Sequence, residues 1–190
     1  SIVVSTNLLA WIVTLHMLLA LVILAILIYT YYYTSGLYKQ ETVIISKVIW
    51  LKVLLIAAII LSILQITLGT EVRESIDALS KMLLYQHRGT WVAKIGQIFS
   101  YHRDAAVLVV VINVFVYQVV MNKFGGKATE LRLANSIVLV LLIQIASGLL
   151  LSNFALPPFA QVVHLVFSTV LFSLQFYLYL LVYRTNTYNQ

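Results

Sequence analysis

The hydrophobic positions of this chain gather in long runs that polar residues hardly interrupt. A helix needs about 20 apolar residues to cross the roughly 30 Å hydrocarbon core of a bilayer. Five runs are near or above this length, and they cover residues 7–33, 47–70, 98–121, 133–151 and 159–183. Because a helix satisfies its own backbone hydrogen bonds in lipid, the pattern predicts an all-α integral membrane protein with five transmembrane helices.

The composition agrees with this reading and excludes other classes. Of the 190 residues, 62% are hydrophobic and 9% are charged, against about 45–50% and about 25% in a soluble domain. Too little polar surface remains to cover a globule in water, which excludes a soluble enzyme domain, a nucleic-acid-binding module and a disordered tail. Cysteine is absent, so disulfides, thiolate metal sites and a cysteine nucleophile are excluded as well.

The basic residues indicate an orientation. The short connections 34–47 and 122–132 carry lysine and arginine, and Arg184 follows the last run. The other side has the uncharged turn 152–158 and one long outer segment of mixed charge, residues 71–97. Because lysine and arginine in short loops mark the cytoplasmic side, we expect the N-terminus outside and the C-terminus in the cytoplasm of a bacterial inner or plasma membrane. The net charge of +6 is then a topology signal and not a nucleic-acid signal.

Three histidines lie inside the predicted spans and are the main candidates for chemistry. Each sits in the outer part of a span that runs from outside to inside, and each is followed four residues later by a small residue on the same helix face. The pairs are His16 with Ala20, His102 with Ala106, and His164 with Ser168. Ionisable residues within spans are rare and usually face a bundle interior or a site.

Two interpretations of these histidines compete. A single histidine in a span more often forms a hydrogen bond to a neighbouring helix. Three at one depth favour axial ligation of a porphyrin iron by two histidines from facing helices, with His102 and His164 as the pair and Arg103 close to a propionate. Zinc is less favoured, because it wants three or four close ligands. His87 lies in a polar stretch and reads as a solvated loop residue.

An internal repeat organises the spans. Residues 65–69 resemble residues 144–148, and each segment lies in a span that precedes a histidine-bearing span. The repeat places a glycine, which permits close helix approach, four residues after a glutamine. The second to fifth spans, residues 47–184, therefore read as one four-helix unit. The first span, residues 1–34, resembles the fifth and reads as the last helix of a preceding unit that the chain lacks.

Together these features resemble the heme A synthase family, eight-span membrane proteins of cytochrome oxidase assembly built from two four-helix halves. The resemblance rests on residues 65–73 leaving a span for the outer loop, on residues 101–103 opening the next span, and on the 62 residues between His102 and His164. It implies that the four-helix unit with its outer loop 71–97 is the C-terminal half. The first span would be the last helix of the N-terminal half.

The resemblance also implies a function, that of a heme A synthase-like oxidoreductase. The family oxidises the C8 methyl of heme O to the formyl group of heme A. In this chain it implies a protoheme, heme b, between His102 and His164, with Tyr101 and Arg103 at the propionate edge. His16 would be one ligand of an incomplete substrate-side site for heme O and heme A. The implied partners are the missing half, heme O, membrane lipid, and heme O synthase or the terminal oxidase complex, without nucleic acid.

Two other functions stay open on the sequence. A membrane b-type cytochrome would carry electrons without hydroxylating anything. A structural subunit of a respiratory complex would use its histidines only for hydrogen bonds and bind no heme. A transporter is disfavoured, because it would be expected to show charged or broken helices near mid-membrane, whereas the polar residues Asn113, Gln118 and Gln144 near the span interiors carry no charge.

Overall fold

A computed structural model describes residues 10–37, 49–124 and 129–184 of the chain. Five long helices dominate it, each long and apolar enough to cross a membrane, and the described part contains no strand. They are α2 (Ala10–Thr34), α3 (Ile49–Met82), α5 (Gln97–Phe124), α6 (Thr129–Asn153) and α7 (Pro158–Arg184). The predicted five-span, all-α fold is therefore confirmed. Two short elements, the 3-10 helix η2 (Arg88–Thr90) and α4 (Trp91–Lys94), connect α3 to α5.

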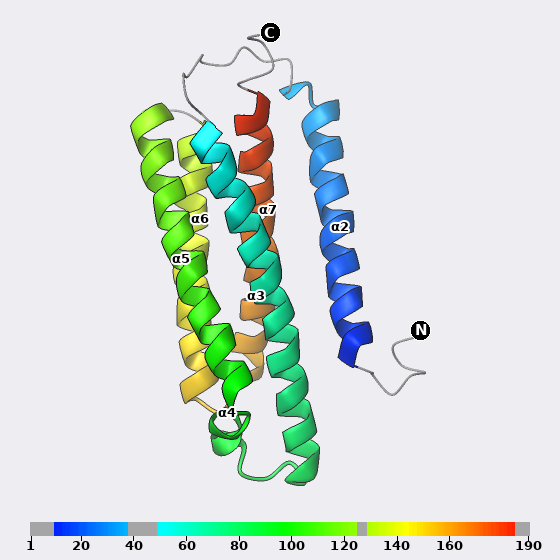
Figure 1. Cartoon of the computed structure of the whole chain (residues 1–190). Helices are drawn as coiled ribbons and strands as arrows, with labels where there is room; N and C mark the ends of the chain where they lie inside the picture. The colour runs from blue at the N-terminus through cyan, green and yellow to red at the C-terminus, as the bar shows by residue number, and fades with distance from the viewer. Residues whose placement is uncertain (1–9, 38–48, 125–128, 185–190) are drawn as a thin grey trace.

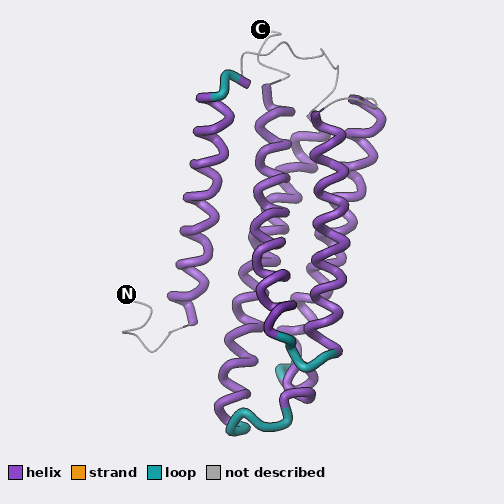
Figure 2. Tube along the Cα trace, turned by 180° about the vertical axis from the view of Figure 1, so that it is seen from behind, coloured by secondary structure: helices purple, strands orange, loops and turns teal. Residues whose placement is uncertain are grey.

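Four of the helices form a bundle and the fifth packs on its side. Helices α3 and α6 each pack against both α5 and α7, so α5 and α7 face each other across the diagonal of the bundle. Helix α2 packs on α3 and α7 and stands apart from the others (Figures 1 and 2). Helices α3 and α6 finish at the same end of the bundle at which α5 and α7 begin. This end is called the histidine end, and it is the lower end in Figure 1.

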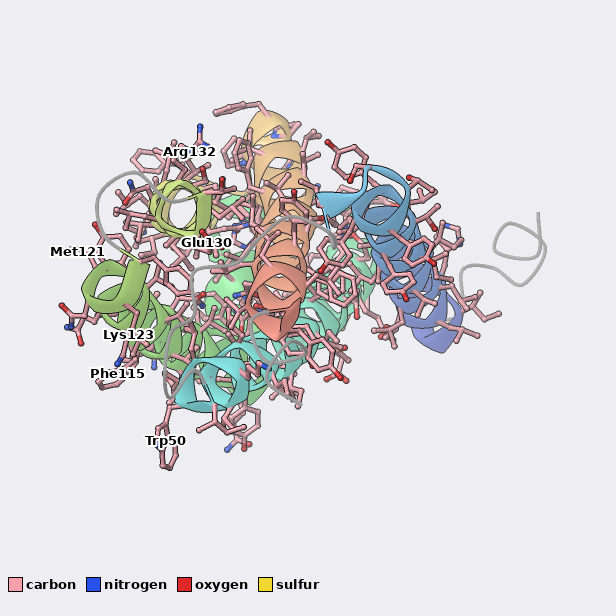
Figure 3. All side chains as sticks on the ribbon, turned by 90° about the horizontal axis from the view of Figure 1, so that it is seen from above. Trp50, Phe115, Met121, Lys123, Glu130 and Arg132 are labelled. Atoms are coloured by element: carbon pink, nitrogen blue, oxygen red, sulfur yellow. The ribbon has the colours of Figure 1, made fainter. Side chains whose placement is uncertain are left out.

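The outer surface of the bundle is apolar, as a lipid-facing surface must be. Seen along the bundle, side chains radiate outward from every long helix, and Trp50 and Phe115 lie at the periphery (Figure 3). Both are more than half exposed. The interior holds one main cluster of aliphatic residues from α3, α5, α6 and α7, and a smaller cluster joins α2 to α3 and α7 through Leu21, Ile66 and Phe172.

Helix α3 differs from the prediction by continuing past the membrane. The sequence reading ended the second span at Thr70 and treated residues 71–97 as an outer loop, but α3 runs to Met82 over 34 residues. That length corresponds to about 51 Å, well beyond the hydrocarbon core. The extension holds because it is amphipathic: Ile76 and Ser80 are buried. Only the stretch between Met82 and the start of α5 forms the connection.

Helix α7 begins where its prolines predict. Pro158 is the first helical residue, a position where proline loses no hydrogen bond and its fixed φ suits the helix. The preceding turn is anchored at the carbonyl of Leu156, which accepts hydrogen bonds from Arg88 Nη2 and Gln161 Nε2, each at 2.7 Å. The connection between α3 and α5 and the turn between α6 and α7 are thereby tied together at the histidine end.

At the opposite end, Lys52 holds the last turn of α7. Its side chain is 8% exposed, its Nζ donates to the carbonyl of Tyr183 at 3.3 Å, and it lies 4.8 Å from the centroid of the Tyr183 ring. A cation at a helix C-terminus is favoured by the helix dipole, and its position over an aromatic ring adds a cation–π term.

We therefore expect Lys52→Met to destabilise the bundle by about 1–2 kcal/mol. Thermal unfolding in detergent, followed by circular dichroism, measures the change. Lys94→Met is the matched control, because Lys94 is exposed on α4. Equal shifts in the two variants would contradict a specific role for Lys52.

Candidate functional site: a pair of histidines

The structure brings two of the three span histidines together. His102 lies in the second turn of α5 and His164 in the second turn of α7. Their ring centroids are 6.3 Å apart and the ring planes make an angle of 62°. Because α5 and α7 are the diagonal helices, the two rings meet across the bundle and are partly buried. The pairing expected from the sequence is thus present as geometry.

Each histidine ring lies against a glycine of the neighbouring helix. A Cβ atom added to Gly69 of α3 would lie 3.3 Å from Cε1 of His102, and one added to Gly148 of α6 would lie 3.5 Å from Cε1 of His164. Both separations are near or below ordinary van der Waals contact. The first separation is tighter than ordinary van der Waals contact, so the His102 ring would have to shift to admit a side chain at position 69, whereas the second is an ordinary contact.

A glutamine one turn before each glycine ties the same two helices together. Nε2 of Gln65 donates to the backbone carbonyl of His102 at 3.0 Å, and Nε2 of Gln144 donates to that of His164 at 2.8 Å. Positions i and i+4 share one helix face, so each glutamine and its glycine act on the same histidine. The repeat seen in the sequence is therefore a repeated structural unit, in which α3 supports α5 and α6 supports α7.

The two rings differ in the groups that face their nitrogens. Ser147 Oγ donates to the carbonyl of Gln144 at 3.0 Å and lies 2.9 Å from Nδ1 of His164. With its own proton directed to Gln144, the serine oxygen suits the tautomer in which it accepts a hydrogen bond from Nδ1–H and Nε2 of His164 keeps a free lone pair. At His102, Nε2 of Gln65 lies 3.2 Å from Nδ1 and 3.4 Å from Nε2. In the other half of the repeat, Leu68 occupies the position of Ser147. The different surroundings of the two rings therefore follow from a difference in sequence.

The pair fits a heme iron in its donor set and its spacing. A histidine nitrogen binds a metal ion at about 2 Å. Two such bonds in one line, together with the distance from each nitrogen to the centre of its ring, give a separation of about 6 Å between the ring centroids. The observed separation is 6.3 Å. Two imidazoles are a common axial set for heme. Within the described residues, no group of three or more His, Cys, Asp or Glu side chains is placed to hold a metal ion.

Two residues predicted at the propionate edge are engaged elsewhere. Tyr101 is 57% exposed and donates to Gln97 of its own helix at 3.3 Å. Arg103 pairs with Asp104 at 3.1 Å and is also mostly exposed. Residues next to His102 in sequence point about 100° to either side of it around the helix. Adjacency in sequence therefore does not place these two side chains in the space between the histidines.

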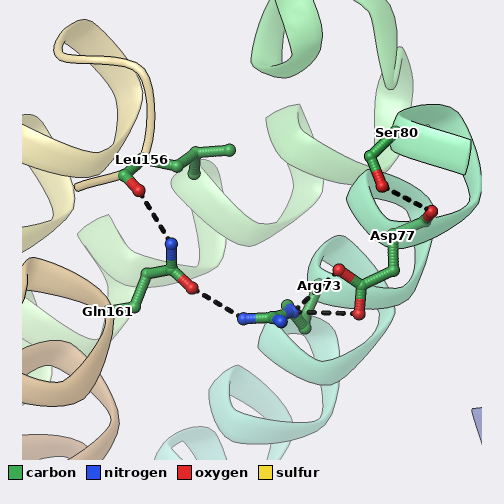
Figure 4. Close-up of polar contacts among 5 residues, drawn as sticks. All are labelled: Arg73, Asp77, Ser80, Leu156 and Gln161. Carbon is green, nitrogen blue, oxygen red and sulfur yellow. Dashed lines mark hydrogen bonds and ion pairs between the residues drawn. The ribbon is translucent and has the colours of Figure 1, made fainter. Parts of the chain in front are cut away.

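An arginine from α3 links α3 to α7 near the histidine end. Nη1 of Arg73 donates to Oε1 of Gln161 on α7 at 2.7 Å, while its Nε pairs with Asp77 at 3.0 Å (Figure 4). Arg73 follows Gly69 by four residues and Gln161 precedes His164 by three, so both lie on the faces that carry the site. Gln161 was not singled out in the sequence analysis. Its position three residues before His164, on the same helix face, is the feature of the sequence that could have indicated it.

The other two histidines are not part of this site. His16 is exposed on α2, and within the described residues its ring makes no hydrogen bond or ring contact. Helix α2 is nevertheless joined to the site, because Thr14 and Thr70 share a hydrogen bond of 2.7 Å beside Gly69. His87 is exposed and has a positive φ of 54° in the loop before η2, as expected for a solvated loop residue.

A bundle of membrane-spanning helices with two histidines facing across its diagonal defines a polytopic helical membrane protein with a paired-histidine centre. The family model for cytochrome oxidase assembly proteins, COX15-CtaA, matches residues 1–176 of the chain. The chain therefore belongs to this family, the heme A synthase family, and has a role in cytochrome oxidase assembly and heme A synthesis. No curated protein and no solved structure matched in the corresponding comparisons.

Proposed function

We propose that the chain binds a protoheme with His102 and His164 as its axial ligands. The observation that carries the proposal is the 6.3 Å separation of the two rings, which come from diagonal helices and each lie against a glycine. Membership of the heme A synthase family supports the choice of heme over another metal group. Arg73 on α3, which contacts Asp77 and Gln161, and Arg103 beside His102 are the two guanidiniums that we propose for the propionates.

His102 and His164 would hold the iron of such a heme, and the chemistry it would supply is one-electron transfer. The side chains around it have separate tasks. Ser147 accepts a hydrogen bond from Nδ1–H of His164 and so favours the tautomer that presents Nε2, a support that also raises ligand basicity. Gln65 and Gln144 hold the backbone of the two histidine turns. The apolar bundle excludes water from the space between the rings.

We further propose that the chain takes part in oxidising the C8 methyl of heme O to the formyl group of heme A. His16 would contribute a ligand to the substrate-side heme. Because His16 lies on the exposed face of α2, a second ligand for that heme must come from helices that pack on this face. We place this face and the paired histidines in the outer half of a bacterial plasma membrane, from the distribution of lysine and arginine. Heme O synthase and the terminal oxidase are the partners this role implies.

The test is the heme content of the chain purified from membranes. We expect a reduced-minus-oxidised spectrum of a low-spin b-type cytochrome and a pyridine hemochrome of protoheme at about one equivalent per chain. A heme-free protein would contradict the proposal and favour a structural subunit. Formation of heme A in a host that makes heme O separates the synthase role from simple electron transfer, which predicts bound heme without heme A.

A further inference from the structure

A second pair of polar residues faces across the bundle deeper in its core. Asn113 of α5 is 1% exposed and Gln175 of α7 is fully buried. Nε2 of Gln175 donates to Oδ1 of Asn113 at 3.1 Å, and Nδ2 of Asn113 donates to the carbonyl of Val109 at 2.7 Å. The two amides thus form a hydrogen bond between the same diagonal helices that carry the histidines.

The amides repeat the spacing of the histidines. Each follows its histidine by eleven residues, from His102 to Asn113 and from His164 to Gln175. Eleven residues are close to three full turns, so the amide lies on the same face of its helix about 16 Å further from the histidine end. The two helices therefore have the same axial register at the histidine pair and at the amide pair.

The buried residues of α5, and four of those of α7, follow one pattern in this register. On both helices the spacing is four, three and four residues, and the members of each pair are 62 residues apart, as the histidines are. The pairs are Val109 with Leu171, Asn113 with Gln175, Val116 with Leu178, and Val120 with Val182. Three of the four layers are aliphatic. Aliphatic layers pack almost equally well after a shift of one turn, so they specify the register weakly.

The amide layer does not tolerate such a shift. A displacement by one turn would place each amide against aliphatic side chains and leave it unpaired in a water-free core, which is costly. Even in the observed register Oε1 of Gln175 has no hydrogen-bond partner within the described residues. An aliphatic pair would avoid that cost. A single buried polar layer that costs stability but selects one alignment is an established way to fix the register of packed helices.

We propose that Asn113 and Gln175 are positioning residues that lock the axial register of α5 against α7 and thereby keep His102 opposite His164. The α3–α5 and α6–α7 pairs touch through other faces, but α5 and α7 meet only across the diagonal. Across it, the histidine rings make an edge contact and the amides make a hydrogen bond. The proposal rests on the proposed heme site for its purpose, but the register itself does not depend on heme.

The test uses thiol cross-linking, since the chain has no cysteine of its own. His102→Cys with His164→Cys reports the native register, and His102→Cys with Ser168→Cys reports a shift of one turn. A short bifunctional thiol reagent is applied to the detergent-solubilised chain, and the ratio of native to shifted cross-linking rates is measured. Each pair is built in the native background, in Asn113→Leu with Gln175→Leu, and in the exchanged pair Asn113→Gln with Gln175→Asn.

We expect the double leucine variant to lower this ratio about 3-fold to 15-fold, the range that measured interhelical hydrogen bonds in membranes give. The exchanged pair should restore much of it. Val116→Ala is the control, because it weakens the core without touching the amides and should leave the ratio unchanged. An unchanged ratio in the leucine variant, or an equal loss in Val116→Ala, would overturn the proposal.

The same variants with native histidines separate this proposal from the heme proposal. If the native chain binds no heme while the cross-linking ratio responds as expected, the heme site fails and the register lock stands. If heme is bound and the ratio does not respond, the lock fails and the heme site stands. If the leucine variant does not fold, the exchanged pair decides, since a ratio equal to the native one supports the lock and a collapsed ratio overturns it.

Discussion

Replacing either His102 or His164 with alanine is expected to abolish the low-spin b-type spectrum of the purified chain. Each substitution removes one of the two imidazoles that face each other at 6.3 Å, and a heme with one remaining histidine is no longer a low-spin bis-histidine centre. The loss should exceed the roughly 10–100-fold effect of removing a group that only supports a ligand. The absorption of the reduced protein, normalised to chain concentration, measures it.

The chain supplies a matched control for this prediction. His16 lies in the corresponding part of α2 but is exposed and faces away from the pair. His16→Ala should therefore keep the b-type spectrum of the bundle. A normal spectrum in either His102→Ala or His164→Ala would contradict the pairing, and loss of the spectrum in all three variants would point to a general folding defect.

A large side chain at Gly69 is expected to remove heme as effectively as loss of a ligand. The added Cβ alone would lie 3.3 Å from Cε1 of His102, and the remaining atoms of leucine would enter the space of the ring. Overpacking of this kind costs about 1–3 kcal/mol, so Gly69→Leu should lower heme occupancy about tenfold or more. Heme titration of the detergent-solubilised chain, followed optically, gives the occupancy.

Alanine at the two glycines provides a graded version of this experiment. The contact would be 3.3 Å at Gly69 and 3.5 Å at Gly148, so Gly69→Ala should weaken heme binding more than Gly148→Ala. Gly89→Ala in the connection after α3 is the control, because nothing lies within 4 Å of the added Cβ. Equal affinities for the Gly69 and Gly89 variants would show that the ring does not need this space.

The sequence predicted the spans well, because a membrane imposes a local requirement. A helix must be long and apolar wherever it crosses lipid, and this requirement acts on each run independently of the others. The same locality explains the error at α3. The charges beyond Thr70 set the end of the predicted span, whereas the i to i+4 pair of Arg73 and Asp77 and the buried Ile76 continue the same helix to Met82.

The sequence predicted which two histidines come together, but it did not predict the side-chain contacts around them. Histidines inside spans are rare enough to stand out singly, and the shared spacing of His102 and His164 within the repeat indicated the pair. The prediction of Tyr101 and Arg103 as neighbours of the cofactor rests on adjacency in sequence, and it stays a prediction. Gln161 was missed because its role depends on Arg73, which comes from a helix nearly ninety residues earlier.

The sequence by itself determined that this is an all-α membrane protein with five spans, and it marked the histidines, glutamines and glycines of the repeat. These are properties of single segments, set by the bilayer and by the period of the helix. Only the tertiary structure decided that α5 and α7 lie on the diagonal, that His102 meets His164 while His16 stays outside, and that Asn113 meets Gln175. Those contacts depend on the rotation and axial register of packed helices, which no segment specifies alone.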